Sequence, residues 1–432
     1  MSRDLFGTDG IRGPAGQYPL DATGAQQVGR AIGRHFAKPG QRLILGYDPR
    51  ESSDQLADNV IKGLTAVGAD VVSVEVVPTP GLAYLAREGD FVAGVMVTAS
   101  HNPYQYNGVK VFDAHGDKLS DDTETALNTL IKTDMPAHEA GKAVVDEYLV
   151  KQYEDFLVAS ANDDRLDGLK IAIDSANGAA SGLAERVFGR LGAQVTALFD
   201  KPDGRNINAG CGATDTGSLK SVVIDKRLDL GIAVDGDADR LALIDEQGRE
   251  VNGDHLLYLL AVTGHLDGVV ATVMSNLGLE RALDQRGIKL ERAKVGDRYV
   301  LEGLRRTGFR LGGEQSGHII MPELLKTGDG LLAAVQTVRA LAADGKSLAQ
   351  WRNEVTLVPQ ALVNIPLADR SSLERPEVRA FIKQQIEQLG REGRLLVRPS
   401  GTEPLVRVMV EAPDAEKVAA AIAGRLKELV AA

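Results

Sequence analysis

The sequence is poor in cysteine and has no excess of positive charge. A single cysteine, Cys211, excludes an intrachain disulfide framework and favours a reducing compartment. The formal net charge of −11 argues against a general nucleic-acid binder, which needs basic surface. No apolar run approaches the roughly 18 residues of a membrane-spanning helix, and the N-terminus MSRDLFGTDG has no apolar signal core. We therefore expect a cytoplasmic protein with neither nucleic acid nor a membrane as partner.

Aromatic residues are also scarce, at 4%, whereas glycine is abundant, with 47 residues. Hydrophobic residues make up 44% of the chain and charged residues 25%, which excludes a disordered chain and is typical of a turn-rich α/β protein. At 432 residues the chain is too long for one hydrophobic core. Its length predicts about three or four domains.

Three segments repeat one plan: an apolar strand ending in Asp or Ser, an amphipathic helix-like stretch, and a glycine before the next strand. The strands that open these repeats are RLILGYD (42–48), LKIAID (169–174) and GVVATVMS (268–275). Each repeat has the pattern of a βαβ unit. The tail beyond residue 357 differs, because its strands and helices form a smaller α+β pattern.

We therefore predict three similar mixed-sheet α/β domains and a smaller C-terminal α+β domain. The predicted boundaries are 1–150, 151–252, 253–360 and 361–432. The stretch EYLVKQYEDFLVA, near residue 150, is expected to be a linking helix.

A cluster of acidic residues follows the apolar strand GIAV in the second domain. Asp235, Asp237 and Asp239 stand on alternate positions, and a second apolar strand follows them. Carboxylates this close repel one another unless a cation lies among them. Oxygen ligands without nearby Cys or His favour Mg²⁺ or Ca²⁺. The pattern therefore predicts a metal site.

Two rival interpretations of this acidic cluster exist. An EF-hand loop also has Asp at its first, third and fifth positions, but Arg240 stands where that loop needs glycine. The flanking segments are also strands rather than helices. An aspartyl nucleophile at Asp235, as in phosphatases of the haloacid dehalogenase type, stays open at this point.

Three further stretches carry side chains suited to a polar ligand. In TASHNP (98–103), Ser100 precedes His101, but neighbours in sequence point in different directions and need not form a catalytic pair. In GGEQSGH (312–318), Glu314, Ser316 and His318 alternate, so an extended loop could project all three to one side. Each of these two patterns is weak when taken alone.

The third stretch, RPSGTEPLVRV (398–408), is more informative. Arg398 and Arg407 flank a turn whose backbone N–H groups, with the hydroxyls of Ser400 and Thr402, can surround an anion. Guanidinium groups supply bidentate hydrogen bonds to phosphate. The stretch therefore predicts a phosphate site.

Together these stretches resemble the α-D-phosphohexomutases, four-domain enzymes that move a phosphate between the two ends of a hexose. Five motifs occur in the family's order and span nearly the whole chain: FGTDGIRG, TASHNP, DGDADR, GGEQSGH and RPSGTEPLVRV. The resemblance implies four domains around a central cleft. Within the family, GGEQSGHII, KVGDRYVLEGL and FGTDGIRG are most similar to the members that act on glucosamine phosphates.

The resemblance also implies roles for individual residues. Ser100 matches the phosphoserine that carries the phosphoryl group, and it supplies a phosphate oxygen to one Mg²⁺ held by Asp235, Asp237 and Asp239. The residues expected beside the transferring group are Lys110, Arg12, His101 and Arg240. The residues expected to bind the sugar and its second phosphate are Glu314, Ser316, His318, Arg398, Ser400, Gly401, Thr402 and Arg407.

The implied reaction converts glucosamine 6-phosphate into glucosamine 1-phosphate through glucosamine 1,6-bisphosphate, as intermediate and activator. Mannose or glucose phosphates are the alternative substrates, because the machinery is shared. A phosphoserine adds about −1.5 to −2 charge, so the acidic cluster needs the cation and nearby Lys110 and Arg240. Besides the phosphosugar no partner is expected, and the protein is expected to be a monomer or a homodimer.

Overall fold

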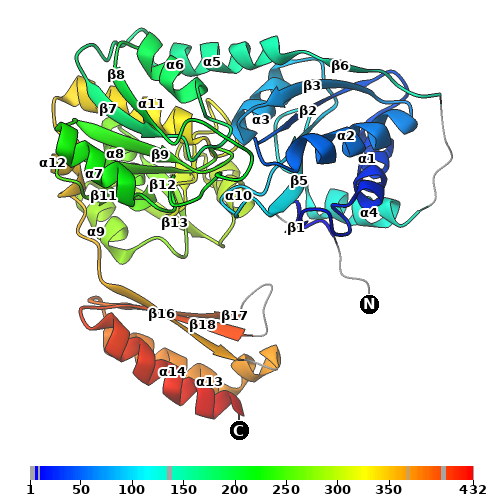
Figure 1. Ribbon diagram of the computed structural model, residues 1–432. Helices are drawn as coiled ribbons and strands as arrows, with labels where there is room; N and C mark the ends of the chain where they lie inside the picture. The colour runs from blue at the N-terminus through cyan, green and yellow to red at the C-terminus, as the bar shows by residue number, and fades with distance from the viewer. Residues whose placement is uncertain (1–4, 8–9, 134–138, 367–368, 400–404, 432) are drawn as a thin grey trace. The chain divides into compact units, whose positions relative to one another are not determined.

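The three strand–helix–strand repeats expected from the sequence are present in the computed structural model (Figure 1). The structure describes residues 5–7, 10–133, 139–366, 369–399 and 405–431. The chain forms two units. The main unit comprises Met1–Met274 and Ile288–Arg352, and the C-terminal unit comprises Ser275–Gly287 and Asn353–Ala432.

The first sheet of the main unit has the strand order β1-β5-β4-β2-β3-β6. Its strands are β1 (Ile11–Pro14), β2 (Arg42–Tyr47), β3 (Asp70–Val76), β4 (Ala93–Val97), β5 (Tyr106–Asp113) and β6 (Ala143–Val145). Its helices are α1 (Ala22–Phe36), α2 (Ser53–Ala66), α3 (Thr79–Glu88) and α4 (Asp121–Ile131). On β2, Leu43 and Leu45 pack with α1, α2 and α4, whereas Ile44 packs with α3 on the opposite face. Because helices cover both faces, β2 and β4 are continuous apolar runs.

The second sheet has the order β11-β10-β9-β7-β8. Its strands are β7 (Lys170–Asp174), β8 (Gln194–Leu198), β9 (Leu230–Val234), β10 (Leu241–Asp245) and β11 (Glu250–Val251). The helical segments of this part are η1 (Glu147–Leu149), α5 (Val150–Ala159), α6 (Leu183–Arg190) and α7 (Gly217–Lys226). Strand β9 is parallel to β7 and antiparallel to β10, and every residue of β9 and β10 is buried. The acidic loop therefore begins where a buried strand ends.

The third sheet has the order β13-β12-β14-β15. Its strands are β12 (Gly268–Thr272), β13 (Lys289–Ala293), β14 (Gly312–Gly313) and β15 (Ile319–Ile320). The helices of this part are α8 (Gly253–Thr263), α10 (Asp297–Thr307), α11 (Gly330–Asp344) and α12 (Leu348–Arg352). Val300 and Leu304 of α10 pack against Val270 and Ile320 of the sheet. Strands β14 and β15 hold the two ends of the GGEQSGH loop side by side.

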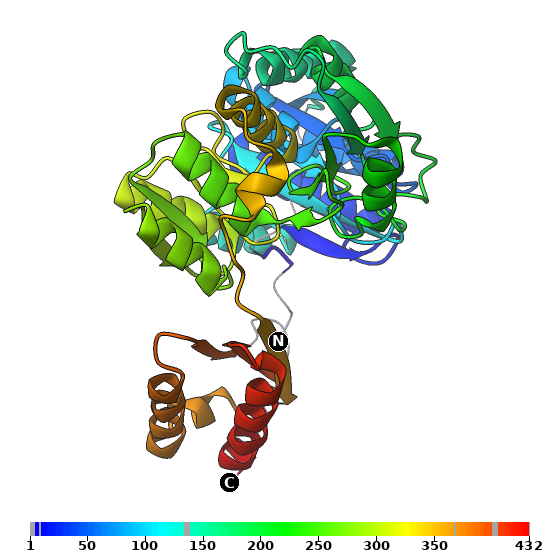
Figure 2. The ribbon, with the colours of Figure 1, turned by 90° about the vertical axis from the view of Figure 1, so that its left-hand side faces the viewer.

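The C-terminal unit is built around an antiparallel sheet with the order β16-β18-β17. Its elements are α9 (Leu277–Gln285), β16 (Gln360–Pro366), η2 (Arg370–Glu374), α13 (Pro376–Leu389), β17 (Arg394–Pro399), β18 (Leu405–Glu411) and α14 (Ala415–Ala431). Helices α13 and α14 cover one face of the sheet (Figures 1 and 2). The predicted fold class, three mixed-sheet α/β domains and a smaller C-terminal α+β domain, is confirmed.

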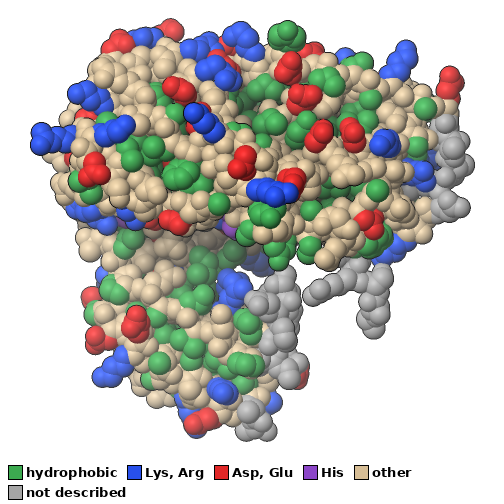
Figure 3. Space-filling model, in the orientation of Figure 1, with side chains coloured by type: hydrophobic (Ala, Val, Ile, Leu, Met, Phe, Trp, Pro, Cys, Tyr) green, Lys and Arg blue, Asp and Glu red, His purple; other side chains and the backbone are tan. Residues whose placement is uncertain are grey.

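Charged side chains of both signs are interspersed on the face of the main unit shown in Figure 3. Among the described residues, no helix has the length and apolar character required to cross a bilayer.

Candidate active site

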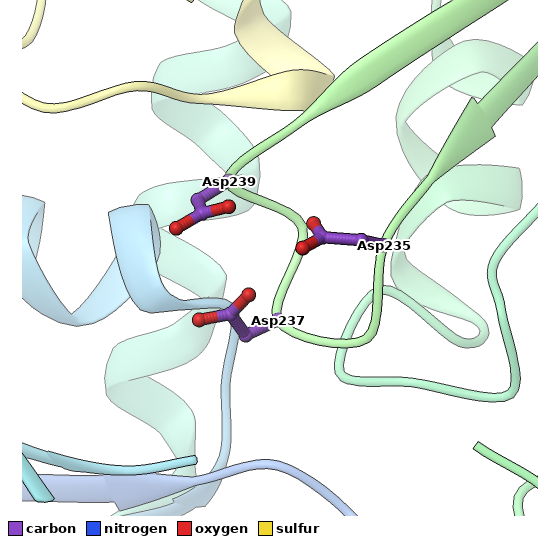
Figure 4. Close-up of side chains that lie close together, drawn as sticks. All are labelled: Asp235, Asp237 and Asp239. Carbon is purple, nitrogen blue, oxygen red and sulfur yellow. The ribbon is translucent and has the colours of Figure 1, made fainter. Parts of the chain in front are cut away.

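The acidic loop connects β9 to β10, the antiparallel pair whose last partners are Val234 and Leu241. Asp235, Asp237 and Asp239 converge inside this short connection, and their carboxylates point toward one another (Figure 4). One oxygen from each lies within 4.8 Å of the others, and all three residues are buried. The alternate spacing in the sequence therefore does produce one cluster.

The chemistry of the loop fits a hard divalent cation. Asp237 Oδ1 and Asp239 Oδ1 are buried without a hydrogen-bond partner, so each has a free lone pair directed into protein. Burial and the charges of Asp239 and Asp237 raise the pKa of Asp235 to about 8. The three carboxylates thus resist being ionised together without a cation. An all-oxygen donor set of this kind is what Mg²⁺ prefers.

Ser100 reaches this loop from the first sheet. It lies in the connection from β4 to β5, and its Oγ donates a hydrogen bond of 2.8 Å to Asp235 Oδ2. The same Oγ lies 3.2 Å from His101 Nδ1, so the two neighbours do contact each other. The Ser100 side of the site and the metal loop, 135 residues apart in the chain, are in direct contact.

Lys110, on β5, offsets part of the negative charge. Its Nζ lies 2.7 Å from Asp237 Oδ2 and 3.3 Å from Asp239 Oδ2. Burial by itself lowers the pKa of Lys110, but Asp237 and Asp239 overcome this effect and raise it. Burial likewise opposes ionisation of Asp239, yet Lys110 and His318 hold its pKa well below the usual range. Lys110 and Asp239 therefore keep each other ionised.

Arg12, Arg240 and His101 lie around the same point. Arg240 donates its backbone N–H to Asp235 Oδ1 at 3.2 Å, and its Nε lies 3.9 Å from Asp239 Oδ1. Arg12 stands on β1, opposite Gly108 of β5. Burial, followed by the charges of Arg240 and Arg12, lowers the pKa of His101 to about 4. His101 is therefore neutral at pH 7.

The third sheet contributes His318 in a different way from the one-sided loop that the sequence suggested. His318 is buried, with Nδ1 3.9 Å from Asp239 Oδ1 and Nε2 3.4 Å from Asp297 Oδ2. Burial by itself lowers the pKa of His318, but the nearby carboxylates of Asp239 and Asp297 raise it to about 10. Ser316 is exposed, and Glu314 Oε1 accepts the N–H of Gly296 at 3.0 Å. Ser316 Oγ donates to Glu314 Oε2 at 3.3 Å, so these two side chains meet, whereas His318 faces Asp239 and Asp297.

The predicted phosphate site lies in the C-terminal unit. Arg398 of β17 and Arg407 of β18 are directly opposite each other in the sheet register. Burial and the charge of Arg407 lower the pKa of Arg398. Two guanidinium groups on facing positions repel each other unless an anion joins them. Ser400, Gly401 and Thr402 lie outside the described residues.

Several polar residues that no sequence motif indicated support the site. Thr79, at the start of α3, donates its Oγ1–H to Asp237 Oδ2 at 2.6 Å and its N–H to Asp237 O at 3.0 Å. Asp48 and Arg50 form a buried ion pair beside the Ser100 loop. A signal was available: Asp48 and Thr79 each follow a strand of a parallel pair, and the carboxyl ends of such strands meet at one edge of the sheet.

The chain is similar throughout to known phosphosugar mutases. Family models of phosphoglucomutase/phosphomannomutase match in four consecutive parts: α/β/α domain I at residues 3–138, domain II at 146–248, domain III at 252–357 and the C-terminal domain at 362–428. Their limits lie beside the predicted domain boundaries, which stay predictions.

Individual relatives are similar over their whole length. A phosphoglucosamine mutase of Thermus thermophilus is 46% identical over 99% of this chain and 98% of the relative. That of Solibacter usitatus is 46% identical over 97% and 96%. The crystal structure of a phosphoglucomutase/phosphomannomutase family protein from Burkholderia thailandensis superimposes with a TM-score of 0.84 at 26% identity, covering 99% of this chain and 97% of that one. Together with the contact between the serine loop and the carboxylate loop, these matches show that the chain belongs to the phosphoglucomutase/phosphomannomutase family, the α-D-phosphohexomutases.

Proposed function

We propose that this protein interconverts glucosamine 6-phosphate and glucosamine 1-phosphate, carrying the phosphoryl group on Ser100. The observation that supports the proposal best is the 2.8 Å hydrogen bond from Ser100 Oγ to Asp235 of the carboxylate cluster. A serine phosphate at this place would lie between a cation site and the ammonium of Lys110. Those are the surroundings that phosphoryl transfer requires.

The cycle has two transfers that mirror each other. In the first, the O1 hydroxyl of glucosamine 6-phosphate forms a bond to phosphorus while the bond from phosphorus to Ser100 Oγ breaks. The electron pair of the broken bond stays on Ser100 Oγ, which takes up the proton that the sugar hydroxyl loses. The resulting glucosamine 1,6-bisphosphate turns end for end, Ser100 Oγ takes the phosphoryl group from O6, and glucosamine 1-phosphate leaves. No water or free phosphate is consumed.

Asp235, Asp237 and Asp239 would hold one Mg²⁺ per chain, together with an oxygen of the Ser100 phosphate. When bound, such an ion withdraws electrons from phosphorus and neutralises charge on the transferring group. Lys110 and Arg12 would stabilise the equatorial oxygens of that group. Because the single proton of Ser100 Oγ is donated to Asp235, neutral His101 with its proton on Nδ1 can donate a hydrogen bond to Ser100 Oγ, 3.2 Å away, and so restrict the serine rotamer.

The remaining predicted contacts concern recognition of the substrate. Glu314 and Ser316 are proposed to bind sugar hydroxyls, with Arg240 nearby. Arg398 and Arg407, with Ser400, Gly401 and Thr402, are proposed to bind the phosphate that is not reacting. Buried His318, which contacts Asp239 and Asp297, is better suited to support the metal loop than to touch sugar. A site that binds the phosphate without contacting the carbon that carries it suits a substrate that binds in two orientations.

Glucosamine phosphate is proposed as the sugar because the phosphoglucosamine mutase of Thermus thermophilus is 46% identical across nearly the whole chain. The test is a comparison of kcat/KM on glucosamine 6-phosphate, mannose 6-phosphate and glucose 6-phosphate, with glucose 1,6-bisphosphate as activator. We expect glucosamine 6-phosphate to be preferred at least about tenfold, because a site that hydrogen-bonds a substrate amine discriminates against analogues without it. Equal values for the three sugars would refute the assignment.

The carrier residue is tested separately by mass spectrometry of the intact protein after incubation with glucose 1,6-bisphosphate. We expect one added phosphate that maps to Ser100 and is absent from the Ser100→Ala variant. That variant should lose mutase activity by at least about 10³-fold, because it lacks the hydroxyl that is proposed to form the covalent intermediate. A phosphate on Asp235 with none on Ser100 would instead indicate an aspartyl phosphotransferase.

A further inference from the structure

The backbone of Ser100 has an unusual conformation. Its φ is +53°, in the left-handed region that residues with a Cβ rarely adopt. Such a conformation persists only where the surrounding structure holds it in place, and it is often found at functional sites. The direction of Ser100 Oγ therefore depends on whatever fixes the peptide groups on either side of this residue.

Arg50 holds this loop from within the first domain. Its side chain is completely buried, and its guanidinium donates Nη2–H to Ser100 O at 2.7 Å. The Nη1 group donates to Pro103 O at 2.6 Å and to Tyr106 O at 3.1 Å. One planar cation thus binds three carbonyl oxygens between the end of β4 and the start of β5. A carbonyl array of this kind matches the fixed donor geometry of arginine and not that of lysine.

Asp48 anchors Arg50 and also reaches the other side of Ser100. Its Oδ2 accepts from Arg50 Nε at 2.8 Å and from Thr98 Oγ1 at 2.6 Å. Thr98 Oγ1 in turn accepts the N–H of Ser100 at 2.9 Å. Ser53 Oγ donates to the other carboxylate oxygen of Asp48 at 2.9 Å. The N–H and the C=O of Ser100 are therefore held by one buried network.

Asn208 holds the same carbonyl from the second domain. Its Nδ2 donates to Ser100 O at 2.9 Å and to Asn102 O at 3.2 Å. Gly236 of the metal loop lies against this bond: a Cβ there would stand 2.7 Å from Asn208 Nδ2 and 2.8 Å from Ser100 O. The carbonyl of Ser100, the amide of Asn208 and the metal loop are in direct contact.

From these contacts we propose that Arg50 and Asn208 are positioning residues for phosphoryl transfer. Between them they clamp the Ser100 carbonyl, keep the residue in its left-handed conformation and so direct Oγ at the Asp235 cluster. The inference rests on the proposed role of Ser100 as the phosphoryl carrier. Neither residue needs to touch the sugar, so both should affect the rate of transfer rather than the binding of substrate.

The test uses the full-length Arg50→Lys and Asn208→Gly variants. Lysine keeps the charge but reaches a single carbonyl, and glycine tolerates the φ of +57° at position 208 while removing the amide. We expect kcat to fall by about 100-fold in Arg50→Lys, because a misplaced reacting group costs rates of that order. In Asn208→Gly, which removes the hydrogen bonds to Ser100 O and Asn102 O but leaves Arg50 on the Ser100 carbonyl, we expect kcat to fall about tenfold. KM should stay within about twofold, because the substrate contacts are intact.

A second readout omits the substrate glucosamine 6-phosphate and uses only the phosphate donor. Transfer of phosphate from glucose 1,6-bisphosphate onto Ser100, followed by intact mass, should slow by the same factors as kcat. The matched control is Arg249→Lys, because Arg249 also donates Nε–H to a buried aspartate, Asp245, at 2.8 Å, but contacts no described part of the Ser100 loop. This control should keep the wild-type kcat.

Wild-type kcat in both variants, an effect confined to KM, or an equal loss in Arg249→Lys would overturn the inference. If Arg50→Lys does not fold, as judged by circular dichroism, Asn208→Gly alone decides the outcome. A wild-type protein that never acquires phosphate on Ser100 would instead refute the proposed function, so the two failures are distinguishable.

Discussion

At the scale of residues, the site is a balance of charge around one serine. Asp235, Asp237 and Asp239 are countered within the cluster by Lys110, which contacts Asp237 and Asp239 directly. If Ser100 carries phosphate, as we propose, the added charge of about −1.5 to −2 would require a bound cation to offset it. The unpartnered oxygens of Asp237 and Asp239 are the local sign of that requirement.

Mg²⁺ is therefore expected to stabilise the protein itself, apart from any effect on activity. At a concentration of Mg²⁺ 100 times its Kd, binding to the folded state alone adds about 2.7 kcal/mol to the free energy of unfolding. EDTA should abolish this gain, and so should Asp237→Asn, which removes a ligand charge. Thermal unfolding with and without MgCl₂, at constant ionic strength, measures the effect.

The matched control for that experiment is Asp225→Asn, on the exposed face of α7. It should respond to Mg²⁺ like the wild type. A Mg²⁺ gain that persists in Asp237→Asn would place the bound ion elsewhere.

At the scale of elements, the N-terminus of α11 is hydrogen-bonded to the metal loop. Asp329 caps the helix, since its Oδ1 accepts the N–H of Leu332 at 2.9 Å. The following N–H, that of Gly330, donates to Ala238 O in the metal loop at 2.9 Å. On its other side Asp329 Oδ2 accepts from Tyr153 OH of α5 at 2.8 Å. The cap thus joins the linking helix α5 to the carboxylate loop.

Burial raises the pKa of Asp329 to about 7, against backbone and Tyr153 hydrogen bonds and the His318 charge that lower it. The folded state therefore holds this proton to higher pH than the unfolded chain, whose pKa is 3.8. The stabilisation is complete below about pH 4 and is lost as pH rises through about 7. The loss is on the order of 4 kcal/mol.

Asp329→Asn has no proton to lose, so its stability relative to wild type should increase between pH 5 and pH 8, by a few kcal/mol. Denaturant midpoints of both proteins at the two pH values measure the difference. Asp344→Asn, near the exposed end of the same helix, is the control and should follow the wild type. A constant difference between Asp329→Asn and wild type would mean that Asp329 is ionised in the folded protein at both pH values.

At the scale of the whole molecule, the parts of the fold set by local pattern were predictable and the contacts between distant segments were less so. Strand–helix repeats follow from apolar spacing. The contact between Ser100 and Asp235 does not follow from local pattern, because separation along the chain does not determine distance in space. Only the resemblance implied this contact. The place of His318 beside buried Asp239 and Asp297 likewise could not be predicted from its spacing in the loop.

The division of the chain into two units also could not be predicted from local sequence pattern. Residues 275–287, between β12 and β13, group with the C-terminal residues rather than with their neighbours in sequence. Asn276 explains part of this, because its side chain exchanges two hydrogen bonds with the backbone of Val358, at 3.0 and 2.8 Å. Such a pairing joins positions 82 residues apart and leaves no periodic signal in the sequence.

Buried Glu411 joins residues 275–287 to the rest of the C-terminal unit. Its carboxylate accepts both Nε–H and Nη2–H of Arg394, at 2.8 and 2.9 Å, and the N–H of Leu277 at 3.1 Å. Arg394 Nη2 also donates to Ser275 O at 2.8 Å. One ion pair therefore ties β17 and β18 to the start of α9, within the C-terminal unit.

Glu411→Gln removes the negative charge that faces Arg394 in a largely buried place, which costs about 3 kcal/mol. We expect this loss to be confined to the C-terminal unit. Hydrogen exchange should accelerate in peptides from residues 275–287 and 353–432 and remain at wild-type rates in the β2 and β9 strands. Glu416→Gln, exposed on α14, should change neither set. Equal acceleration in both units would show that they unfold as one cooperative body, because the stability lost at Glu411 would then be shared by every strand of the chain.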